Sequence, residues 1–138
     1  NLEENGVITN EEFINATFTQ HYRTVDEFKK PFEDPNSLVT KSGLILKSCK
    51  TMFTDCPFKV HYNNNKSNMT AREYAETLIP TMRSWSETVF KTALEKRDPE
   101  EIEKIVDQFY NSYLEEVANA PDGHAMDYIH VVMDIEKV

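Results

Sequence analysis

Two long segments carry apolar side chains at helical spacing. In each, intervals of three and four residues bring the apolar positions onto one face, which is typical of an amphipathic helix. The segments cover about residues 71–97 and 99–119. Their apolar stripes are Tyr74, Leu78, Met82, Trp85, Val89 and Ala93 in the first, and Ile102, Ile105, Val106, Phe109, Tyr113 and Val117 in the second. Because Pro80 removes one backbone hydrogen bond, we expect a kink or two abutting helices near Ile79.

Four helix starts are marked by capping boxes. In this motif a Thr or Asp side chain accepts an unpaired helix amide, and a Glu three residues later bonds back to the backbone of the capping residue. The pairs are Thr9 with Glu12, Thr24 with Glu27, Thr70 with Glu73, and Asp98 with Glu101. Pro99 follows Asp98 at the first helical position, where a missing amide hydrogen costs nothing. Besides the two long helices, these signals predict short helices over residues 10–16 and 25–33.

Two further segments are predicted as strands, Gly43–Met52 and Asp127–Lys137. The polar, Asn-rich stretch over residues 62–68 lacks periodicity and predicts a loop. A two-stranded sheet is marginal in water and leaves its edges unpaired. Either the helices alone cover the pair, or the strands complete a sheet whose other strands lie elsewhere. The apolar alternation in the second strand favours a larger fold.

Charge and glycine content exclude several kinds of site. The 138 residues carry 15 Lys and Arg against 24 Asp and Glu, a net charge of −9, so a nucleic-acid backbone would be repelled. The three glycines stand alone, which excludes a Rossmann fingerprint or P-loop within the chain. The apolar runs are far shorter than the roughly 20 residues that cross a bilayer, so we expect no membrane span.

Cysteine and histidine usage adds little chemistry. Cys49 and Cys56 make neither a disulfide framework nor a zinc site, so reduced thiols and a cytoplasmic location are expected. Three N-glycosylation sequons leave secretion as the less favoured location. The four histidines lack the spacing of metal ligands, so we expect no metal site.

Several motifs occur in an order that resembles one enzyme family. They are Gly6-Val-Ile-Thr-Asn-Glu-Glu-Phe13, Thr17-Phe-Thr-Gln-His-Tyr22, Thr24-Val-Asp-Glu-Phe28, Gly43-Leu-Ile-Leu46, Met82-Arg-Ser-Trp-Ser-Glu87, Phe109-Tyr-Asn-Ser-Tyr113 and the segment 128–137. In this order they resemble the C-terminal part of the plant-type SABATH carboxyl methyltransferases, which methylate salicylate, jasmonate, benzoate and related small acids. The resemblance covers about residues 6–137.

The resemblance implies an α/β fold, the C-terminal part of a Rossmann-like methyltransferase, which in this chain is mainly helical with two strands. Residues 1–138 would form one segment that supplies the last strands and the helical cap, without the N-terminal cofactor-binding part. By position, Met82, Trp85 and Tyr128 would line the acceptor pocket. The missing part would bind S-adenosylmethionine, so this chain alone would be inactive. The implied partners are a small-molecule acceptor, that missing part and, in some members, a second copy in a homodimer.

Methyl transfer to an acid also agrees with the lack of a catalytic constellation. A substrate carboxylate is ionised at neutral pH and the sulfonium donor is already activated, so alignment and exclusion of water suffice and no catalytic residue is predicted. An alternative is a stand-alone acidic helical module without catalysis. It would bind a hydrophobic ligand or a partner protein through the face that carries Tyr74, Leu78, Met82 and Trp85. Met and Trp at helical spacing are also common in cores.

Overall fold

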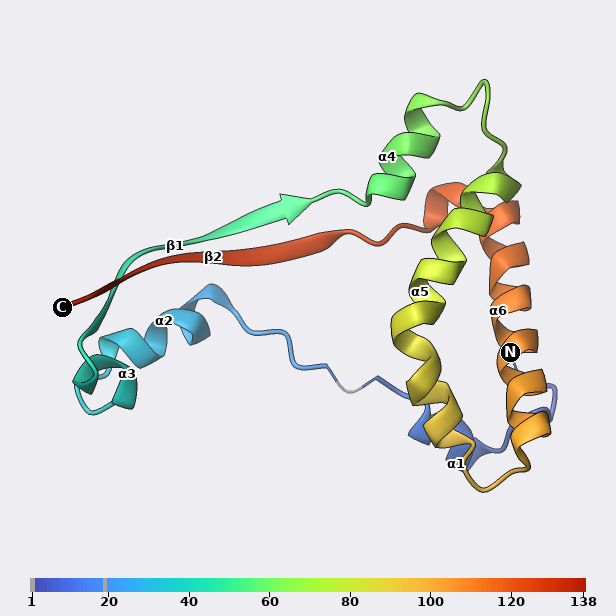
Figure 1. The fold of residues 1–138 in the computed structure, drawn as a ribbon, viewed down its shortest axis with the longest axis horizontal. Helices are drawn as coiled ribbons and strands as arrows, with labels where there is room; N and C mark the ends of the chain where they lie inside the picture. The colour runs from blue at the N-terminus through green and yellow to red at the C-terminus, as the bar shows by residue number, and fades with distance from the viewer. Residues whose placement is uncertain (1, 19) are drawn as a thin grey trace. The chain divides into compact units, whose positions relative to one another are not determined.

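The computed structural model describes residues 2–18 and 20–138 (Figure 1). Its elements are α1 (Asn10–Asn15), α2 (Val25–Glu33), α3 (Leu38–Lys41), β1 (Leu44–Thr54), α4 (Pro57–Asn64), α5 (Ala71–Ala93), α6 (Pro99–Asn119), the short 3-10 helix η1 (Pro121–Gly123) and β2 (Tyr128–Lys137). The described part is therefore mostly helical with two strands, as predicted. It divides into two compact units, a helical unit (residues 2–18 and 57–126) and a hairpin unit (residues 20–56 and 127–138).

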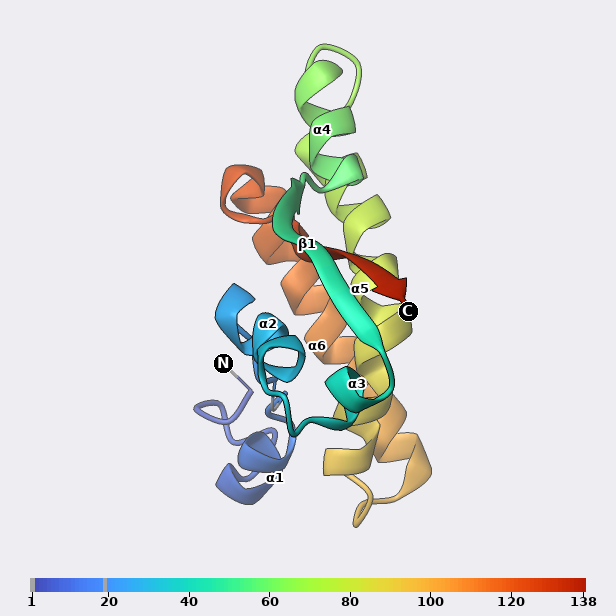
Figure 2. The same ribbon diagram turned by 90° about the vertical axis from the view of Figure 1, so that its left-hand side faces the viewer.

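The helical unit is built on α5 and α6, which lie side by side and run antiparallel (Figures 1 and 2). Five residues of the predicted stripes are buried in the core: Tyr74, Leu78, Ile105, Val106 and Val117. Ala75, Ile79 and Tyr110, which lie outside the predicted stripes, are buried as well. Ser86 is buried among them. Its hydroxyl donates to the Met82 carbonyl oxygen at 2.6 Å and lies 2.6 Å from the Tyr110 hydroxyl. Since Ser86 has one hydroxyl hydrogen, Tyr110 donates to Ser86.

The predicted helices are mostly confirmed. The helices α2 and α6 have the expected bounds, whereas α5 ends at Ala93, four residues earlier than predicted. It continues through Pro80 as one helix, so the expectation of two abutting helices is wrong. Residues before and after Pro80 are buried in the core, among them Leu78, Ile79 and Ser86.

Three of the four capping boxes form as predicted, at Thr9, Thr24 and Thr70. The fourth does not, because the Asp98 side chain makes no capping bond. Glu101 instead accepts a hydrogen bond from Arg97 at 2.7 Å, so a charged partner replaces the backbone as its donor.

The predicted loop over residues 62–68 is partly wrong, because α4 extends to Asn64. Tertiary contacts stabilise this helix. Tyr62 stacks on Tyr74 with ring centroids 4.9 Å apart, and Lys59 donates to the Pro121 carbonyl and pairs with Asp122 at 3.1 Å. The polar sequence of residues 62–68 predicted a loop because it does not indicate these contacts with residues far away in the chain.

In the hairpin unit, β1 and β2 pair antiparallel from Leu44 opposite Lys137 to Thr54 opposite Tyr128, with an irregularity between Leu46 and Ser48. Both predicted strands are confirmed within two residues. The helix α2 lies against β1 in this unit. At the start of β1, Gly43 has a φ of 75°. The Val138 amide donates to the Gly43 carbonyl at 2.9 Å, which joins the last residue to the start of the hairpin.

The hairpin unit contains almost no buried side chain. Of its described residues only Cys56 is buried. Large apolar side chains on both strands remain exposed: Ile45, Met52, Phe53, Tyr128, Ile129, Val132, Met133 and Ile135. The hairpin is thus held by its backbone ladder and by α2 and α3 rather than by a core of its own.

Replacing Gly43 by Ala is expected to weaken the hairpin. A Cβ there would lie 2.7 Å from the Val138 carbonyl oxygen, and a positive φ strains an L residue, so the ladder should open more easily by about 1–3 kcal/mol. Amide hydrogen exchange along β1 and β2 measures this. Gly123→Ala is the matched control, since nothing lies within 4 Å of its Cβ position. Equal exchange in the two variants would contradict the assignment.

Candidate functional site

A pocket of about 570 Å³ lies within the helical unit. Its walls are the N-terminal segment with α1, the end of α5 and one stripe of α6. The apolar part of the lining includes Phe13, Phe90, Leu94, Ile105, Phe109 and Tyr113. Ligand sites typically have this size and a mainly apolar lining. The pocket is therefore the best-formed candidate site among the described residues.

A salt bridge holds the N-terminal wall in place. The Arg97 guanidinium donates to both carboxylate oxygens of Glu12, at 2.6 and 2.7 Å, and to the Val7 carbonyl oxygen at 3.1 Å. Glu12 also accepts from the Thr9 amide at 2.7 Å as part of the capping box. The side chains of Glu12 and Arg97 are only 14% and 19% exposed. The Glu12 carboxylate thus caps the N-terminus of α1 and also binds α1 to Arg97 in the turn after α5.

These contacts favour the ionised form of Glu12. Hydrogen bonding from Arg97, together with the Thr9 amide and hydroxyl, lowers the pKa of the Glu12 carboxyl from 4.5 to about 2. The attraction between the two charges acts in the same direction, and burial opposes it. Glu12 lines the pocket, but Arg97 and Thr9 already occupy its oxygens.

A row of aromatic rings connects the predicted residue Trp85 to the pocket. Phe18 makes edge contacts with Trp85 and Phe90, with centroids 5.6 and 5.7 Å apart. Phe90 contacts Phe109 at 4.7 Å, and both line the pocket. Trp85 itself does not line it and is 48% exposed, so it is not a core residue.

The other two predicted site residues lie apart from the pocket. Met82 is half-buried one turn before Trp85 on α5, and it does not line the pocket. Tyr128 begins β2 in the hairpin unit, is 45% exposed and stacks on His130 with centroids 5.8 Å apart. Met82 and Trp85 are therefore neighbours, whereas Tyr128 belongs to the other unit.

Half of the helix face considered for the alternative module is core. Tyr74 and Leu78 are fully buried, so of its four residues only Trp85 is exposed. The Tyr74 hydroxyl donates to the His124 carbonyl at 2.7 Å. Of this face, only Met82 and Trp85 are therefore accessible to a hydrophobic ligand or partner.

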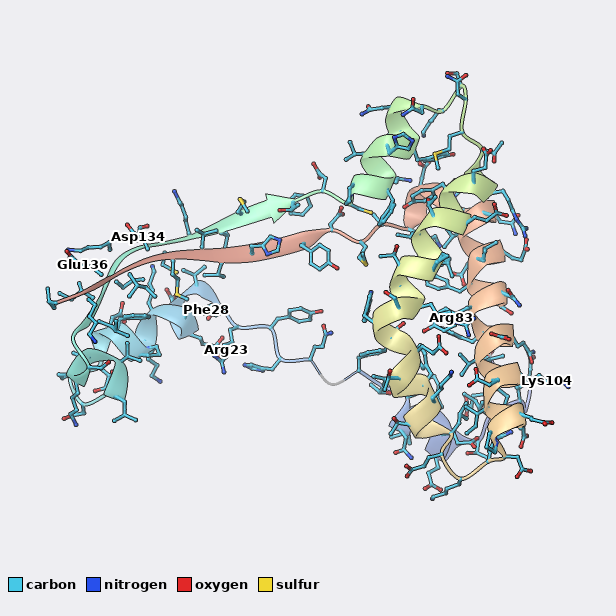
Figure 3. The ribbon with its side chains drawn as sticks, in the orientation of Figure 1. Arg23, Phe28, Arg83, Lys104, Asp134 and Glu136 are labelled. Carbon is cyan, nitrogen blue, oxygen red and sulfur yellow. The ribbon has the colours of Figure 1, made fainter. Side chains whose placement is uncertain are left out.

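Arg83, the second residue of the Met-Arg-Ser-Trp-Ser-Glu motif, joins α5 to α6. Figure 3 shows Arg83 between the two helices, whereas Lys104 points away from them. The Arg83 guanidinium contacts Glu87 at 2.6 Å and Asp107 at 2.7 Å and lies over the Tyr110 ring. Hydrogen bonds from Arg83 and Lys91 lower the pKa of the Glu87 carboxyl to about 2. Arg83 thus has a structural role.

Sequence reasoning missed the pocket, although one signal pointed to it. Ile8 precedes the Thr9 cap and Phe13 follows four residues after it, which is the pattern of a hydrophobic staple. Both residues line the pocket. The staple indicates an apolar contact beside α1, but it does not reveal that α5 and α6 form the opposite wall.

Within residues 2–18 and 20–138, no group of three or more His, Cys, Asp or Glu side chains is placed to hold a metal ion. No helix in this part of the chain is both long and apolar enough to cross a membrane. Compared with protein-family models and with curated proteins, the chain matches none.

Substituting Glu12 by Gln should destabilise the helical unit in a pH-dependent way. Because the pKa of Glu12 is lower in the folded state, its stabilisation is present above about pH 4.5 and is lost as the pH falls toward 2. We expect a loss on the order of 2 kcal/mol at pH 7 that shrinks toward pH 2. Urea unfolding followed by fluorescence of Trp85, the sole tryptophan, measures it.

Glu11→Gln serves as the control for this charge change, because Glu11 pairs with Lys96 on the surface. It should cost about 0.5 kcal/mol or less. A pH-independent effect of Glu12→Gln, or an equal effect of both substitutions, would contradict the role assigned to the Arg97 contact.

The Ser86 and Tyr110 pair should respond unequally to truncation. Ser86→Ala leaves the buried Tyr110 hydroxyl without its acceptor, which should cost about 1–3 kcal/mol. Tyr110→Phe leaves Ser86 still donating to Met82, so the loss should be about 1 kcal/mol or less. Urea unfolding of the two variants checks the order. The reverse order would show that Tyr110 is not the donor.

Proposed function

We propose that this chain forms the C-terminal, acceptor-pocket portion of an S-adenosylmethionine-dependent methyltransferase that acts on a small-molecule acid, similar to the SABATH enzymes. The observation that carries the proposal is the hairpin of β1 and β2, which is long, apolar and almost without buried side chains. It supports the expectation that these strands belong to a larger sheet.

The register of the hairpin gives one face that is mainly apolar and one face that is mixed. One face carries Leu46, Cys49, Phe53, Ile129, Val131, Met133 and Ile135. The other carries Ile45, Met52, Tyr128 and Val132 among six polar or charged residues: Ser48, Lys50, Thr54, His130, Asp134 and Glu136. An antiparallel sheet commonly packs its apolar face against other chain and leaves its polar face in water, so the mainly apolar face is the one that a larger fold would cover. Residues 57–126 of the helical unit connect the two strands, so the connection is of the size of a cap rather than a hairpin loop.

Trp85 and Tyr128 are suited to an acid acceptor in this proposal. Each is about half exposed, and each combines an apolar ring with a neutral hydrogen-bond donor. An indole N–H or a phenol O–H can donate a hydrogen bond to a carboxylate, so each residue by itself has the chemistry of an acid-binding side chain. Met82 would contribute an apolar wall that helps to exclude water.

The described residues do not fit the methyl donor. The three glycines of the chain are isolated, and its two strands are antiparallel, so no strand end followed by a glycine-rich loop faces a cofactor. In the proposal the donor is therefore bound by residues outside this chain, and the 138 residues alone bind no S-adenosylmethionine.

The proposal is tested on the longer protein. Sequencing the message upstream of the Asn1 codon should reveal a strand, a glycine-rich loop and an acidic residue after the next strand. That protein should transfer methyl groups to small carboxylic acids, as measured with labelled S-adenosylmethionine. An initiation codon directly upstream, or no transfer to any acid, would overturn the proposal.

Substitution of Trp85 by Ala should change acceptor choice in that protein. The smaller side chain enlarges the acceptor pocket, so the ratio of kcat/KM for 2-naphthoate to that for benzoate should rise by about tenfold. Tyr128→Phe should raise the KM for both acids, because it removes one donor to the carboxylate. Tyr22→Phe is the control, since Tyr22 is 83% exposed and outside the proposed site. The Kd of the donor should stay unchanged in all three variants.

A module without catalysis is the second candidate, and the pocket of the helical unit favours it. A buried core and an apolar pocket of about 570 Å³ are sufficient for a ligand-binding protein. Ligand binding by a 138-residue protein with no upstream coding sequence would support this candidate over the enzyme.

A further inference from the structure

The pocket of the helical unit has aromatic walls. Phe13 from α1, Phe90 from α5 and Phe109 and Tyr113 from α6 all line it. The centroids of Phe109 and Tyr113 lie 6.2 Å apart, so neighbouring ring surfaces meet along α6. A ligand that fills this space must have a largely apolar body.

The ionised groups of the lining have one sign. Among the described residues that line the pocket, none is Lys, Arg or His, and two are Glu. Glu12 is held by Arg97 and Thr9. Glu116 is 68% exposed at its side chain, and its contact with the His124 ring nitrogen is long, at 3.9 Å. Glu116 therefore leaves a negative charge at the mouth of an apolar pocket.

The position of Glu116 in α6 strengthens this preference. Ile105, Phe109, Ser112 and Glu116 recur at helical spacing along the stripe of α6 that lines the pocket. Glu116 is the last of them, within one turn of the helix end at Asn119. The carboxyl end of a helix carries partial negative charge, which favours a cation there. Aromatic faces attract cations as well.

We propose that this pocket binds a small apolar amine, with its hydrocarbon body among the phenylalanine rings and its ammonium group beside Glu116. The charge of Glu116 repels a carboxylate, so the pocket is distinct from the acid-acceptor site of the proposed function. The proposal depends only on residues of the helical unit and does not rest on methyl transfer.

Three compounds with one skeleton test the charge preference: 4-phenylbutylamine, 4-phenylbutanol and 4-phenylbutyrate. Isothermal titration calorimetry of the full 138-residue chain at pH 7 should give the lowest Kd for the amine and the highest Kd for the acid. Glu116→Gln should weaken amine binding about 3- to 5-fold, as expected for an exposed ion pair, and leave the alcohol unchanged. Glu115→Gln is the matched control, because Glu115 pairs with Arg72 and does not line the pocket.

The location of binding is checked by NMR. The amine should shift amide signals of α1 and of the lining stripe of α6, and Ala93→Phe should abolish the shifts by filling the pocket. Equal binding of the three compounds, tighter binding of the acid, or an unchanged amine affinity in Glu116→Gln would overturn the proposal. So would loss of amine binding in the longer protein, since another segment would then fill the pocket. Methyl transfer is measured in a separate assay, so failure of amine binding would not count against the proposed function, and absence of methyl transfer would not count against amine binding.

Discussion

The salt bridge between Glu12 and Arg97 holds the N-terminal segment against the helical pair, and the pocket depends on it. The same carboxylate accepts the capping bonds of Thr9 and two guanidinium bonds from Arg97, so the start of α1 and its docking use one side chain. Arg97 also donates to the carbonyl oxygen of Val7 in the N-terminal segment and to the carboxylate of Glu101 in α6. Without this contact the segment would keep its apolar contacts but lose the bonds that orient it, and the pocket would lose a wall.

The two units are stabilised in different ways. In the helical unit α5 and α6 bury a common stripe and cross-link through Arg83, Asp107, Ser86 and Tyr110. The hairpin unit has a backbone ladder and the contacts of α2 and α3, with one buried residue. Because apolar burial is the main favourable term in folding, the hairpin is the part that gains most from additional chain packed against it. This contrast, rather than any single residue, supports a larger fold.

Local rules predicted most of the elements and little of the site. Apolar periodicity, capping motifs and strand alternation predicted α2, α6 and both strands, because each of these signals depends on residues close in sequence. These rules failed where contacts with other parts of the chain determine the structure. Tyr62 lies in a helix and stacks on Tyr74, and Glu101 accepts a hydrogen bond from Arg97 instead of completing the capping box with Asp98. The pocket needed the same long-range information, because Phe13 and Phe109 are almost a hundred residues apart in the chain. Sequence periodicity placed Tyr74 and Leu78 on a candidate binding face that is in fact core.

Charge separates the two proposed sites. With a net charge of −9, the chain as a whole attracts small cations and repels small acids, so binding of an acid acceptor depends on local hydrogen-bond donors. Trp85 and Tyr128 are neutral donors, which is why an acid is compatible with them despite the charge of the chain. The pocket beside Glu116 has no Lys, Arg or His in its described lining. The net negative charge of the chain and the charge of Glu116 therefore both attract a cation to this pocket. In the two proposals the acid is selected by neutral hydrogen-bond donors and the amine by a carboxylate and aromatic rings, so the net charge of the chain excludes neither ligand.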